Sequence, residues 1–385
     1  MPLKISDRGA VPPFIVMDVL RAANQRQAEG RDVLHLELGQ PATSAPQGVI
    51  AAAKRAIDTD PIGYTEAFGL PELRQRIAGW YKSEYDVDVP TDRIVVTTGS
   101  SAGFVLAFLS AFDAGDRIAL ADPGYPGYRN ILHSLNVTPV GLAASQETRF
   151  QPVPEMLDGE KDALDGLIVA SPSNPAGTMI SAPELERLAD ACREREIRLI
   201  SDEIYHGICY GEPGETALKF DQRSIIISSF SKYFSMTGWR IGWMVVPEEL
   251  LRSVECLAQN IYISAPTLSQ LAAIAAFDCR EELDRNVARY AANRTVLLDG
   301  LSELGLNRRA PADGAFYVYA DVGDLTNDSE AFCRTLLNET GVAITPGIDF
   351  DPGRGNRYIR LSFSGATGDI EKAVERMGDW LSRYR

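Results

Sequence analysis

Short apolar runs alternate with longer amphipathic stretches through the middle of the chain, between residues 92 and 246. Each run is rich in β-branched residues and ends at a polar or glycine-containing segment, which is typical of buried strands. The stretches between the runs have the apolar spacing of helices, and Ser181 with Glu184 forms a capping box at the start of one of them. The pattern predicts strands at residues 94–98, 117–121, 167–170, 197–200 and 224–228, and helices at 102–112 and 181–196.

Near-continuous apolar strands separated by helices indicate a mostly parallel sheet with helices on both faces. Polar residues repeatedly follow the ends of these strands. Ligands of such sheets bind at the carboxyl ends of the strands, so these residues are candidates for a functional site. The segments concerned are Gly99-Ser100-Ser101, 122–126, 171–175, 201–203 and 229–232.

A long helical stretch at residues 281–304 leads the chain out of this sheet into a smaller α+β unit. We expect residues 1–45 to pack with the smaller unit. Neither an internal repeat nor a low-complexity linker separates the two parts, so we expect one rigid assembly. The smaller unit has predicted strands at residues 315–320, 342–345 and 358–363, and predicted helices at 329–340 and 369–383.

Composition indicates a globular protein of two domains. A chain of 385 residues is longer than a single hydrophobic core usually supports. A content of 45% hydrophobic and 24% charged residues is typical of folded proteins. No apolar run reaches the roughly 18–20 residues that cross a membrane, and the polar start of the chain disfavours a secretory signal. The net charge of −15 disfavours binding to nucleic acid or anionic lipid.

Cysteine and histidine usage indicates a cytoplasmic protein without a metal site. The five cysteines form no CxxC pair, which is typical of reduced thiols. The three histidines are isolated from one another and from the cysteines, so structural roles are favoured over metal ligation.

Lys232 is the most informative residue for chemistry. It follows the predicted strand 224–228 and precedes the glycine-containing turn that ends at Arg240. Burial lowers the pKa of a lysine and frees its lone pair, which suits Schiff-base chemistry. The alternative is a surface lysine whose ammonium group reaches solvent.

Other polar residues at the strand ends each have a functional and a structural interpretation. Gly99-Ser100-Ser101 is either a phosphate cradle at a helix start or an ordinary turn, and Arg240 either a positive clamp or an ion-pair partner. Asp202 is either a structural carboxylate or the partner of a protonated ring nitrogen. The same ambiguity holds for Asn174 as a turn former, Tyr125 as a stacking platform and Arg360 as a carboxylate fork.

Taken together, these residues fit one ligand. It carries a phosphate, an aromatic ring with a basic nitrogen, and an aldehyde for Lys232, and it works beside a substrate carboxylate at Arg360. Pyridoxal 5′-phosphate meets this description.

The chain resembles the fold-type I aminotransferases of the class I/II family across nearly its whole length. The resemblance lies in the order of its sequence blocks, since each block alone is weak. These are Leu38-Gly39-Gln40-Pro41, Gly63-Tyr64, 69–74, Thr98-Gly99-Ser100, 171–177, 202–205, 229–232, 237–240 and Arg360-Leu361-Ser362. The resemblance implies an α/β fold in which a mostly parallel seven-stranded sheet lies between helices. The implied divisions are an N-terminal segment (1–45) packing with the small domain, a large cofactor-binding domain (46–283) and a small α+β domain (284–385).

The resemblance also implies a role for each site residue. Lys232 would hold the cofactor as a Schiff base and act as general base and acid. Asp202 would keep the pyridine nitrogen protonated, Asn174 and Tyr205 would bond the phenolic oxygen, and Tyr125 would stack on the ring. Arg360 and the backbone near Gly39 would bind the substrate carboxylate, and Asn174 would also contact the substrate. The phosphate would be held by Gly99, Ser100, Ser101, Ser229, Arg240 and, from a partner subunit, Tyr64.

The expected function is therefore a homodimeric aminotransferase that moves an amino group between an L-amino acid and a 2-oxo acid by a ping-pong mechanism. A C–S β-lyase or another non-transaminating enzyme on the same fold remains the alternative. A serine acyl hydrolase is disfavoured because the SxxK match at Ser229 lacks a later Lys-Thr-Gly strand. A ligand sensor is disfavoured because no DNA-binding domain precedes the family-like sequence.

Two departures disfavour a dedicated aspartate enzyme. Ser101 stands where some relatives carry a lysine, and residues 260–267 contain no arginine to read a side-chain carboxylate. We assign substrate choice loosely to Phe14, Ile15, Tyr64, Ile261, Tyr262, Phe316 and Tyr317.

Overall fold

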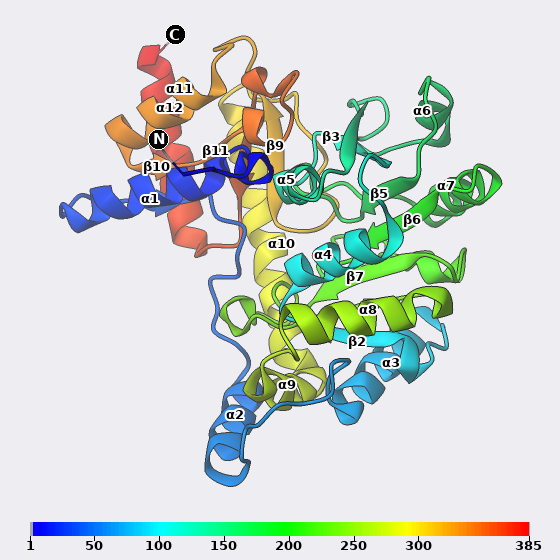
Figure 1. The fold of residues 1–385 in the computed structure, drawn as a ribbon. Coiled ribbons are helices and arrows are strands. Elements are labelled where there is room, and N and C mark those ends of the chain that lie inside the picture. The colour runs from blue at the N-terminus through cyan, green and yellow to red at the C-terminus, as the bar shows by residue number, and fades with distance from the viewer. Residues whose placement is uncertain (1–2, 385) are drawn as a thin grey trace.

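The structure is a computed structural model that describes residues 3–384. The predicted sheet is present: it has seven strands in the order β2-β8-β7-β6-β5-β3-β4, and the pairs that involve β8 are antiparallel while the others are parallel (Figure 1). The fold is thus α/β with a mostly parallel sheet. Its strands are β2 (Ile94–Thr97), β3 (Arg117–Asp122), β4 (Thr138–Ala143), β5 (Gly166–Ala170), β6 (Arg198–Asp202), β7 (Ile225–Ser229) and β8 (Gly242–Val245).

Helices cover both faces of this sheet because its strands are apolar on both sides. In β7, Ile225 and Ile227 pack with α4, α5 and α8, whereas Ile226 packs on the opposite face with α3 and α7. The helices are α2 (Gln47–Thr59), α3 (Pro71–Tyr85), α4 (Ser100–Ala111), α5 (Pro126–Ser134), α6 (Pro154–Asp158), α7 (Ala182–Glu194), α8 (Glu248–Ile261) and α9 (Thr267–Ile274). The expected capping box of Ser181 and Glu184 opens α7.

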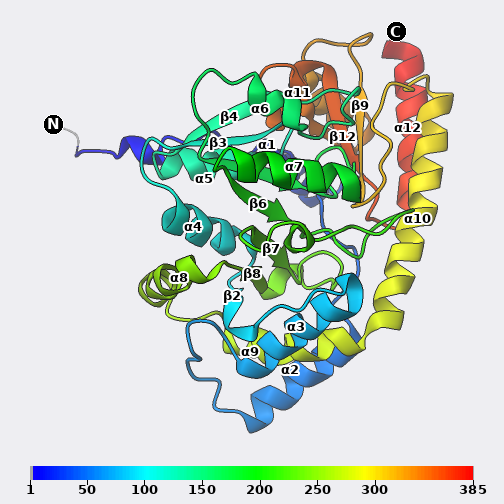
Figure 2. The same cartoon turned by 90° about the vertical axis from the view of Figure 1, so that its right-hand side faces the viewer.

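A smaller α+β unit stands beside the large sheet. Its three-stranded antiparallel sheet has the order β11-β12-β9. The long helix α10 runs down one side of the molecule next to α12 and joins the two units (Figure 2). The elements are α10 (Arg280–Glu303), β9 (Tyr317–Asp321), α11 (Ser329–Thr340), β10 (Val342–Ala343), β11 (Thr345–Pro346), β12 (Tyr358–Ser362) and α12 (Thr367–Tyr384).

The N-terminal segment lies against the smaller unit. Strand β1 (Leu34–His35) pairs in parallel with β10, and helix α1 (Ile15–Ala28) lies along β10 and β11. The proposed domain boundaries stay a prediction, and residues 1, 2 and 385 of those domains lie outside the described residues.

Two predicted strands differ in detail from the structure. The single strand predicted at 342–345 is wrong, because the chain divides into β10 and β11, which belong to different sheets. The Thr345 hydroxyl donates to the carbonyl of Glu37 and so joins this turn to the N-terminal segment. The strand predicted from residue 315 begins at Tyr317, because Ala315 has a φ of +54°, which is incompatible with extended backbone.

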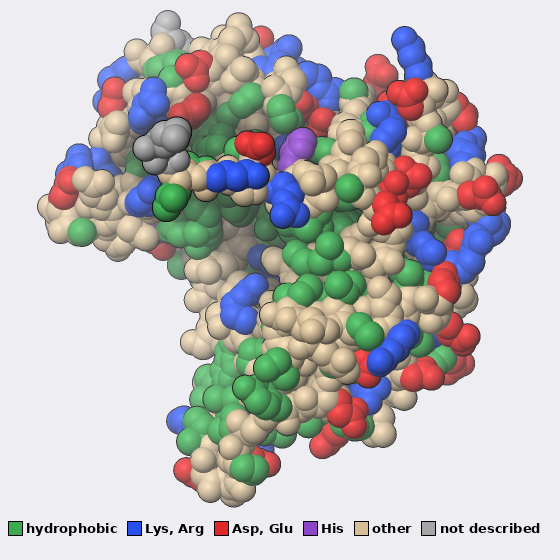
Figure 3. All heavy atoms as spheres, viewed as in Figure 1, with side chains coloured by type: hydrophobic (Ala, Val, Ile, Leu, Met, Phe, Trp, Pro, Cys, Tyr) green, Lys and Arg blue, Asp and Glu red, His purple; other side chains and the backbone are tan. Residues whose placement is uncertain are grey.

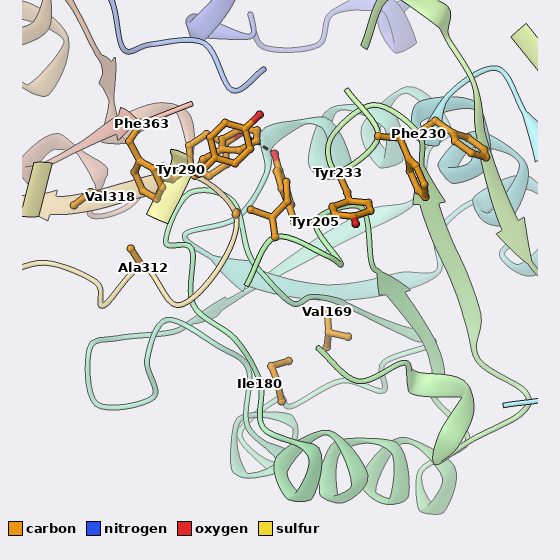
Figure 4. Packing of buried hydrophobic residues seen from close by; sticks show 14 of the residues in the cluster. Val169, Ile180, Tyr205, Phe230, Tyr233, Tyr290, Ala312, Val318 and Phe363 are labelled. Carbon is orange, nitrogen blue, oxygen red and sulfur yellow. Dashed lines mark hydrogen bonds between the residues drawn. The ribbon is translucent and has the colours of Figure 1, made fainter. Parts of the chain in front are cut away.

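One hydrophobic cluster extends through both units. Phe230 and Tyr233, which follow the large sheet, belong to the same buried cluster as Tyr290, Val318 and Phe363 of the smaller unit (Figure 4). Because packed interiors resist deformation, this shared core fixes the relative position of side chains from the two units.

Two properties of residues 3–384 bear on function. Across these residues, every helix is too short or too polar to cross a membrane. Within the same range, no group of three or more histidine, cysteine, aspartate and glutamate residues has a metal-binding arrangement.

A buried polar network supports the carboxyl end of β6. Glu203 is 2% exposed, and its Oε1 accepts hydrogen bonds from the Thr216 hydroxyl (2.9 Å) and the Ala217 amide (3.0 Å). His206, which bonds the Tyr85 hydroxyl at 2.7 Å, lies on the other side of the carboxyl group. Burial raises the pKa of Glu203 to about 8 and lowers the pKa of His206 to about 4. Both side chains are therefore largely neutral at pH 7.

We predict that Glu203→Gln flattens the pH dependence of stability. The wild-type carboxyl group has a higher pKa in the folded than in the unfolded protein, so its stabilising contribution is complete at low pH and is lost as pH rises through 8. As the pH rises from about 5 to about 8, the Glu203 carboxyl group lowers the free energy of unfolding by up to about 1.4 kcal/mol per pH unit. Urea unfolding of both proteins across this range measures the difference; parallel pH profiles would contradict the prediction.

Candidate active site

A cavity of about 420 Å³ opens at the carboxyl ends of β5, β6 and β7, between the large sheet and the smaller unit. Most of the predicted site residues come together there, although they are far apart in sequence. Those that line it are Gly39, Ser100, Ser101, Tyr125, Asn174, Asp202, Tyr205, Lys232, Arg240 and Arg360.

Lys232 follows β7 and its amine lies among charged groups of the cavity. The side chain is half-buried, and Nζ donates a hydrogen bond to the carbonyl of Gly39 at 2.6 Å. Burial lowers the pKa of the amine to about 8, with the positive charges of Arg360 and Arg240 adding to this effect and Asp202 opposing it. About a tenth of the amine is thus unprotonated at pH 7, far more than for a lysine with the ordinary pKa, and is available as a nucleophile or base.

Asp202 is the last residue of β6 and is buried. Its Oδ1 accepts a hydrogen bond from the Ile204 amide at 3.1 Å, and its Oδ2 accepts one from the Tyr128 hydroxyl. Burial raises the pKa of the Asp202 carboxyl group to about 6 in spite of these donors. A protonated ring nitrogen in the cavity would stabilise the ionised carboxylate, so this environment fits the expected cofactor.

Tyr128 is a site residue that the sequence argument missed. It lies on α5, three residues after Tyr125, and the two rings meet edge to face with their centroids 5.2 Å apart. Both tyrosines line the cavity. The i, i+3 spacing after the strand-end loop is the signal that would have placed both on one helix face.

The start of α4 fits a phosphate. Gly99 has a φ of +80°, and a Cβ there would lie 2.6 Å from Nη2 of Arg240, so the guanidinium packs directly against the glycine. Ser100 and Ser101 begin the helix, where backbone N–H groups are free to bind an anion. A cationic fork beside a helix N-terminus and two hydroxyl groups is suited to a phosphate dianion.

Of the two serines that most closely precede Lys232, Ser231 lines the cavity and Ser229 does not. Ser229 lies outside the lining, and its hydroxyl donates to the carbonyl of Ile241 at 3.1 Å. It also contacts the hydroxyl of Ser231 at 2.9 Å, and Ser231 lines the cavity. Ser231 was not singled out from the sequence, although it directly precedes Lys232.

Arg360 enters the cavity from β12 and is held rigidly. Its guanidinium lies between the rings of Tyr317 (4.5 Å) and Phe350 (4.8 Å), and Nη1 donates to Oδ1 of Asn174 at 2.9 Å. Nη2 donates to the carbonyl of Glu37, whereas Nε makes no hydrogen bond to the residues that the structure describes. A buried guanidinium with remaining donor capacity is suited to a substrate carboxylate.

Tyr205 and Tyr317 join the two sides of the cavity. Their hydroxyl groups are 2.6 Å apart, one from the segment after β6 and the other from β9. Glycine is required at position 39, because a Cβ there would overlap the hydroxyl of Tyr317. The contact with Tyr317 fixes the Tyr205 hydroxyl. The Tyr205 ring lies beside Lys232, whose Nζ is 5.7 Å from the ring centre.

Some predicted residues lie elsewhere. Tyr64 is 83% exposed and does not line the cavity of its own chain, so its predicted role in a partner subunit stays a prediction. Of the residues assigned to substrate choice, Phe14 and Tyr317 line the cavity. Those outside the lining are Ile15, Tyr64, Ile261, Tyr262 and Phe316.

Comparisons with known proteins identify the family of the chain. The family described as "Aminotransferase class I and II" matches residues 31–377. The chain is 51% identical to a valine–pyruvate aminotransferase of Mycobacterium tuberculosis over 98% of both chains. It is 34% identical to a (5-formylfuran-3-yl)methyl phosphate transaminase of Methanocaldococcus jannaschii over 96% of this chain and 97% of the relative.

Solved structures agree with these sequence comparisons. An aminotransferase from Mycobacterium tuberculosis superimposes with a TM-score of 0.97 at 50% identity, covering 99% of this chain and 100% of that one. Aspartate aminotransferase from Thermus thermophilus, solved with maleate, gives a TM-score of 0.92 at 29% identity, covering 98% and 100%.

We predict that Lys232 is the most nucleophilic lysine of the cofactor-free protein at neutral pH. Its amine titrates near pH 8, whereas ion pairs with Asp86 and Asp88 raise the pKa of Lys82 above the usual value. Labelling with limiting acetic anhydride across a pH series, read by peptide mass spectrometry, gives the midpoint for each lysine. Equal midpoints for Lys232 and Lys82 would contradict the prediction.

Proposed function

The chain belongs to the class I and II aminotransferases and is an enzyme that transfers amino groups, and we propose that its donors are amino acids with apolar side chains, with pyridoxal 5′-phosphate as cofactor. The observation that carries this proposal is the composition of the cavity wall. The positively charged residues among the described lining are Lys232, Arg240 and Arg360, and each already has a role in binding the cofactor or the α-carboxylate. A side-chain carboxylate of the substrate would have no positive partner of its own.

Much of the remaining cavity wall is apolar. It suits a donor such as valine, because a buried hydrocarbon side chain gains most from contact with other hydrocarbon groups. The similarity to a valine–pyruvate aminotransferase supports the same donor, with pyruvate as acceptor. The apolar residues are Phe14, Val16, Met17, Leu20, Leu38, Phe104, Ile131, Ala170 and Ile204.

The residues at the cavity would hold the cofactor at five points. Ser100, Ser101 and Arg240 would bind its phosphate, and Tyr125 would lie against its ring. Asp202 would bond the ring nitrogen, and Asn174 and Tyr205 the phenolic oxygen. Lys232 would bind it covalently through Nζ. When bound, the cofactor supplies an electron sink for the negative charge that develops at the substrate α-carbon.

Lys232 would also move the proton that the transfer requires. With a pKa of about 8, Nζ accepts a proton from the substrate α-carbon without remaining permanently protonated. The same atom would then donate that proton to a second carbon at the other end of the reacting system. Arg360 would bind the carboxylate that amino acid and 2-oxo acid share, so both would use one site in turn, as a ping-pong mechanism requires.

We propose that the active form is a homodimer in the cytoplasm. Large apolar side chains remain exposed near the end of α2, the loop that follows it and the end of α8. Figure 3 shows hydrophobic side chains gathered over the α2 and α9 end of the molecule. A second copy would cover this face and bring its Tyr64 to the phosphate site. The exposed residues are Ile57, Ile62, Tyr64, Ile261 and Ile263. The five unpaired cysteines suit a reducing compartment.

We predict that the holoenzyme forms alanine from pyruvate with valine or leucine as donor at least about tenfold faster than with aspartate, since an unpaired buried carboxylate costs several kcal/mol. Amino-acid chromatography measures the product, and Lys232→Ala is the inactive control. Preference for aspartate would contradict the donor class. Release of ammonia in place of alanine would indicate a lyase.

We predict that Arg360→Ala raises KM for every donor by a similar factor. Loss of a charge-assisted contact worth about 1.5–3 kcal/mol corresponds to roughly 10- to 150-fold. Arg360→Lys keeps the positive charge but loses the two-pronged guanidinium, so its KM should lie between those of the wild type and Arg360→Ala. Steady-state kinetics with valine and leucine test this, with circular dichroism as the control for folding. A KM close to that of the wild type would exclude Arg360 as the carboxylate site.

A further inference from the structure

Helix α1 forms part of the apolar wall but does not cap its own N-terminus. Phe14 lies just before the helix, and Val16, Met17 and Leu20 belong to it; all four line the cavity. The residue at the N-cap position is Phe14, which has no side-chain oxygen to accept the free N–H groups of the first turn. Figure 3 shows hydrophobic side chains in the hollow beneath α1.

Asp349 supplies the missing cap from the smaller unit. It ends the short 3-10 helix Gly347–Asp349 and is 5% exposed. Its Oδ1 accepts a hydrogen bond from the amide of Ile15 and its Oδ2 one from the amide of Val16, each at 3.1 Å. One carboxylate therefore binds the first two N–H groups of α1, where the helix dipole favours a negative charge.

The backbone of Asp349 is itself fixed by the large sheet. Arg129 of α5 donates to the carbonyls of Asp349 (3.1 Å) and Phe350 (3.2 Å) and pairs with Asp122 at 2.6 Å. The ring of Phe350 packs on the guanidinium of Arg360. The start of α1 and the carboxylate-binding arginine are thus both supported by residues 349 and 350.

We propose that Asp349 is a positioning residue for donor selectivity: by capping α1 it holds Phe14, Val16 and Met17 against the substrate side chain. This inference rests on the proposed function, since selectivity presupposes an amino-acid donor in the cavity. The other end of α1 is held independently, because Arg26 donates to the carbonyls of Asp32 and Asn338. Loss of Asp349 therefore loosens the first turns of α1, where the wall lies, and leaves the rest of the helix attached.

Among the described residues, the reacting groups make no hydrogen bond to α1 or to the side chain of Asp349. Lys232, Asp202 and Arg360 lie on other elements, and their hydrogen bonds are to partners outside α1. The ring of Phe14 meets the ring of Tyr125 edge to face, with the ring centres 5.6 Å apart. A loosened α1 would lose this contact, while Lys232, Asp202 and Arg360 would stay in place. The expected defect is weaker binding of large apolar side chains, with little change in the chemical step.

Asp351 provides a matched control for Asp349. It lies in the same loop, is 3% exposed, and likewise accepts two backbone hydrogen bonds, from Gly353 (3.0 Å) and Arg354 (2.9 Å). Its hydrogen-bond partners lie within its own turn and not in α1. Asp351→Asn therefore perturbs the same loop, including the 2.8 Å ion pair between Asp351 and Arg354, without removing the cap.

The first measurement is hydrogen exchange of the cofactor-free protein, which does not depend on activity. Asp349→Ala should increase the exchange rates of the amides of residues 15–20 by about tenfold or more, since two buried donors lose their acceptor. Asp349→Asn, whose amide has one acceptor oxygen, should give an intermediate increase and serves if the alanine variant fails to fold. Asp351→Asn should leave α1 at the wild-type rates. Unchanged exchange in both Asp349 variants would overturn the anchoring role.

The second measurement is the half-reaction of holoenzyme with one amino acid and no acceptor, followed by stopped-flow absorbance and by 2-oxo acid analysis. In Asp349→Ala the apparent dissociation constant for valine should rise about tenfold, the rate at saturation should change less than about threefold, and alanine should be affected little. Equal losses with valine and alanine would overturn the selectivity role. A wild-type enzyme that reacts with no amino acid would overturn the proposed function, and the exchange rates would still decide whether Asp349 anchors α1.

Discussion

The burial of an amine among charged groups is the constraint on which the rest of the site depends. Lys232 lies between a buried carboxylate, Asp202, and the guanidinium of Arg360, and burial keeps its pKa near 8. The parallel sheet creates this arrangement: β6 and β7 end side by side, with Asp202 opposite Ile227, so the carboxylate and the segment that carries Lys232 reach one edge together. In water the same three charges would interact too weakly to shift the pKa of the amine by this amount.

Because Lys232 and Arg360 come from different units, the core between those units sets the distance across which a substrate must fit. The shared hydrophobic cluster provides that rigidity, and two polar contacts cross the cavity itself: the Tyr205–Tyr317 pair and the bond from Arg360 to Asn174. Loosening either contact would move the carboxylate site relative to the amine. Small displacements of this kind are costly in enzymes, since orientation contributes several kcal/mol to a reaction barrier.

The sequence predicts the sheet and most of the cavity because both follow from local patterns. Apolar runs give the strands, and Gly99, Asp202 and Lys232 stand at their ends. Residues that act across long separations leave no such pattern. Tyr128 of α5 donates a hydrogen bond to Asp202 at the end of β6. Asp349 caps α1, although it lies 334 positions from Ile15. The division of 342–345 into two strands likewise depends on the bond of Thr345 to Glu37, which no local propensity reveals.

This separation of local and distant residues has a functional counterpart. The groups that handle the proton and the cofactor lie at the edge of a rigid sheet, whereas part of the apolar wall lies on a helix, α1, that is held at its start by one side chain of another unit. A change in the wall therefore alters which side chain is accepted without changing the charges around Lys232, since hydrocarbon contacts contribute little to the pKa of an amine that is already buried. Chemistry and donor choice are in this way physically independent, although they share one cavity.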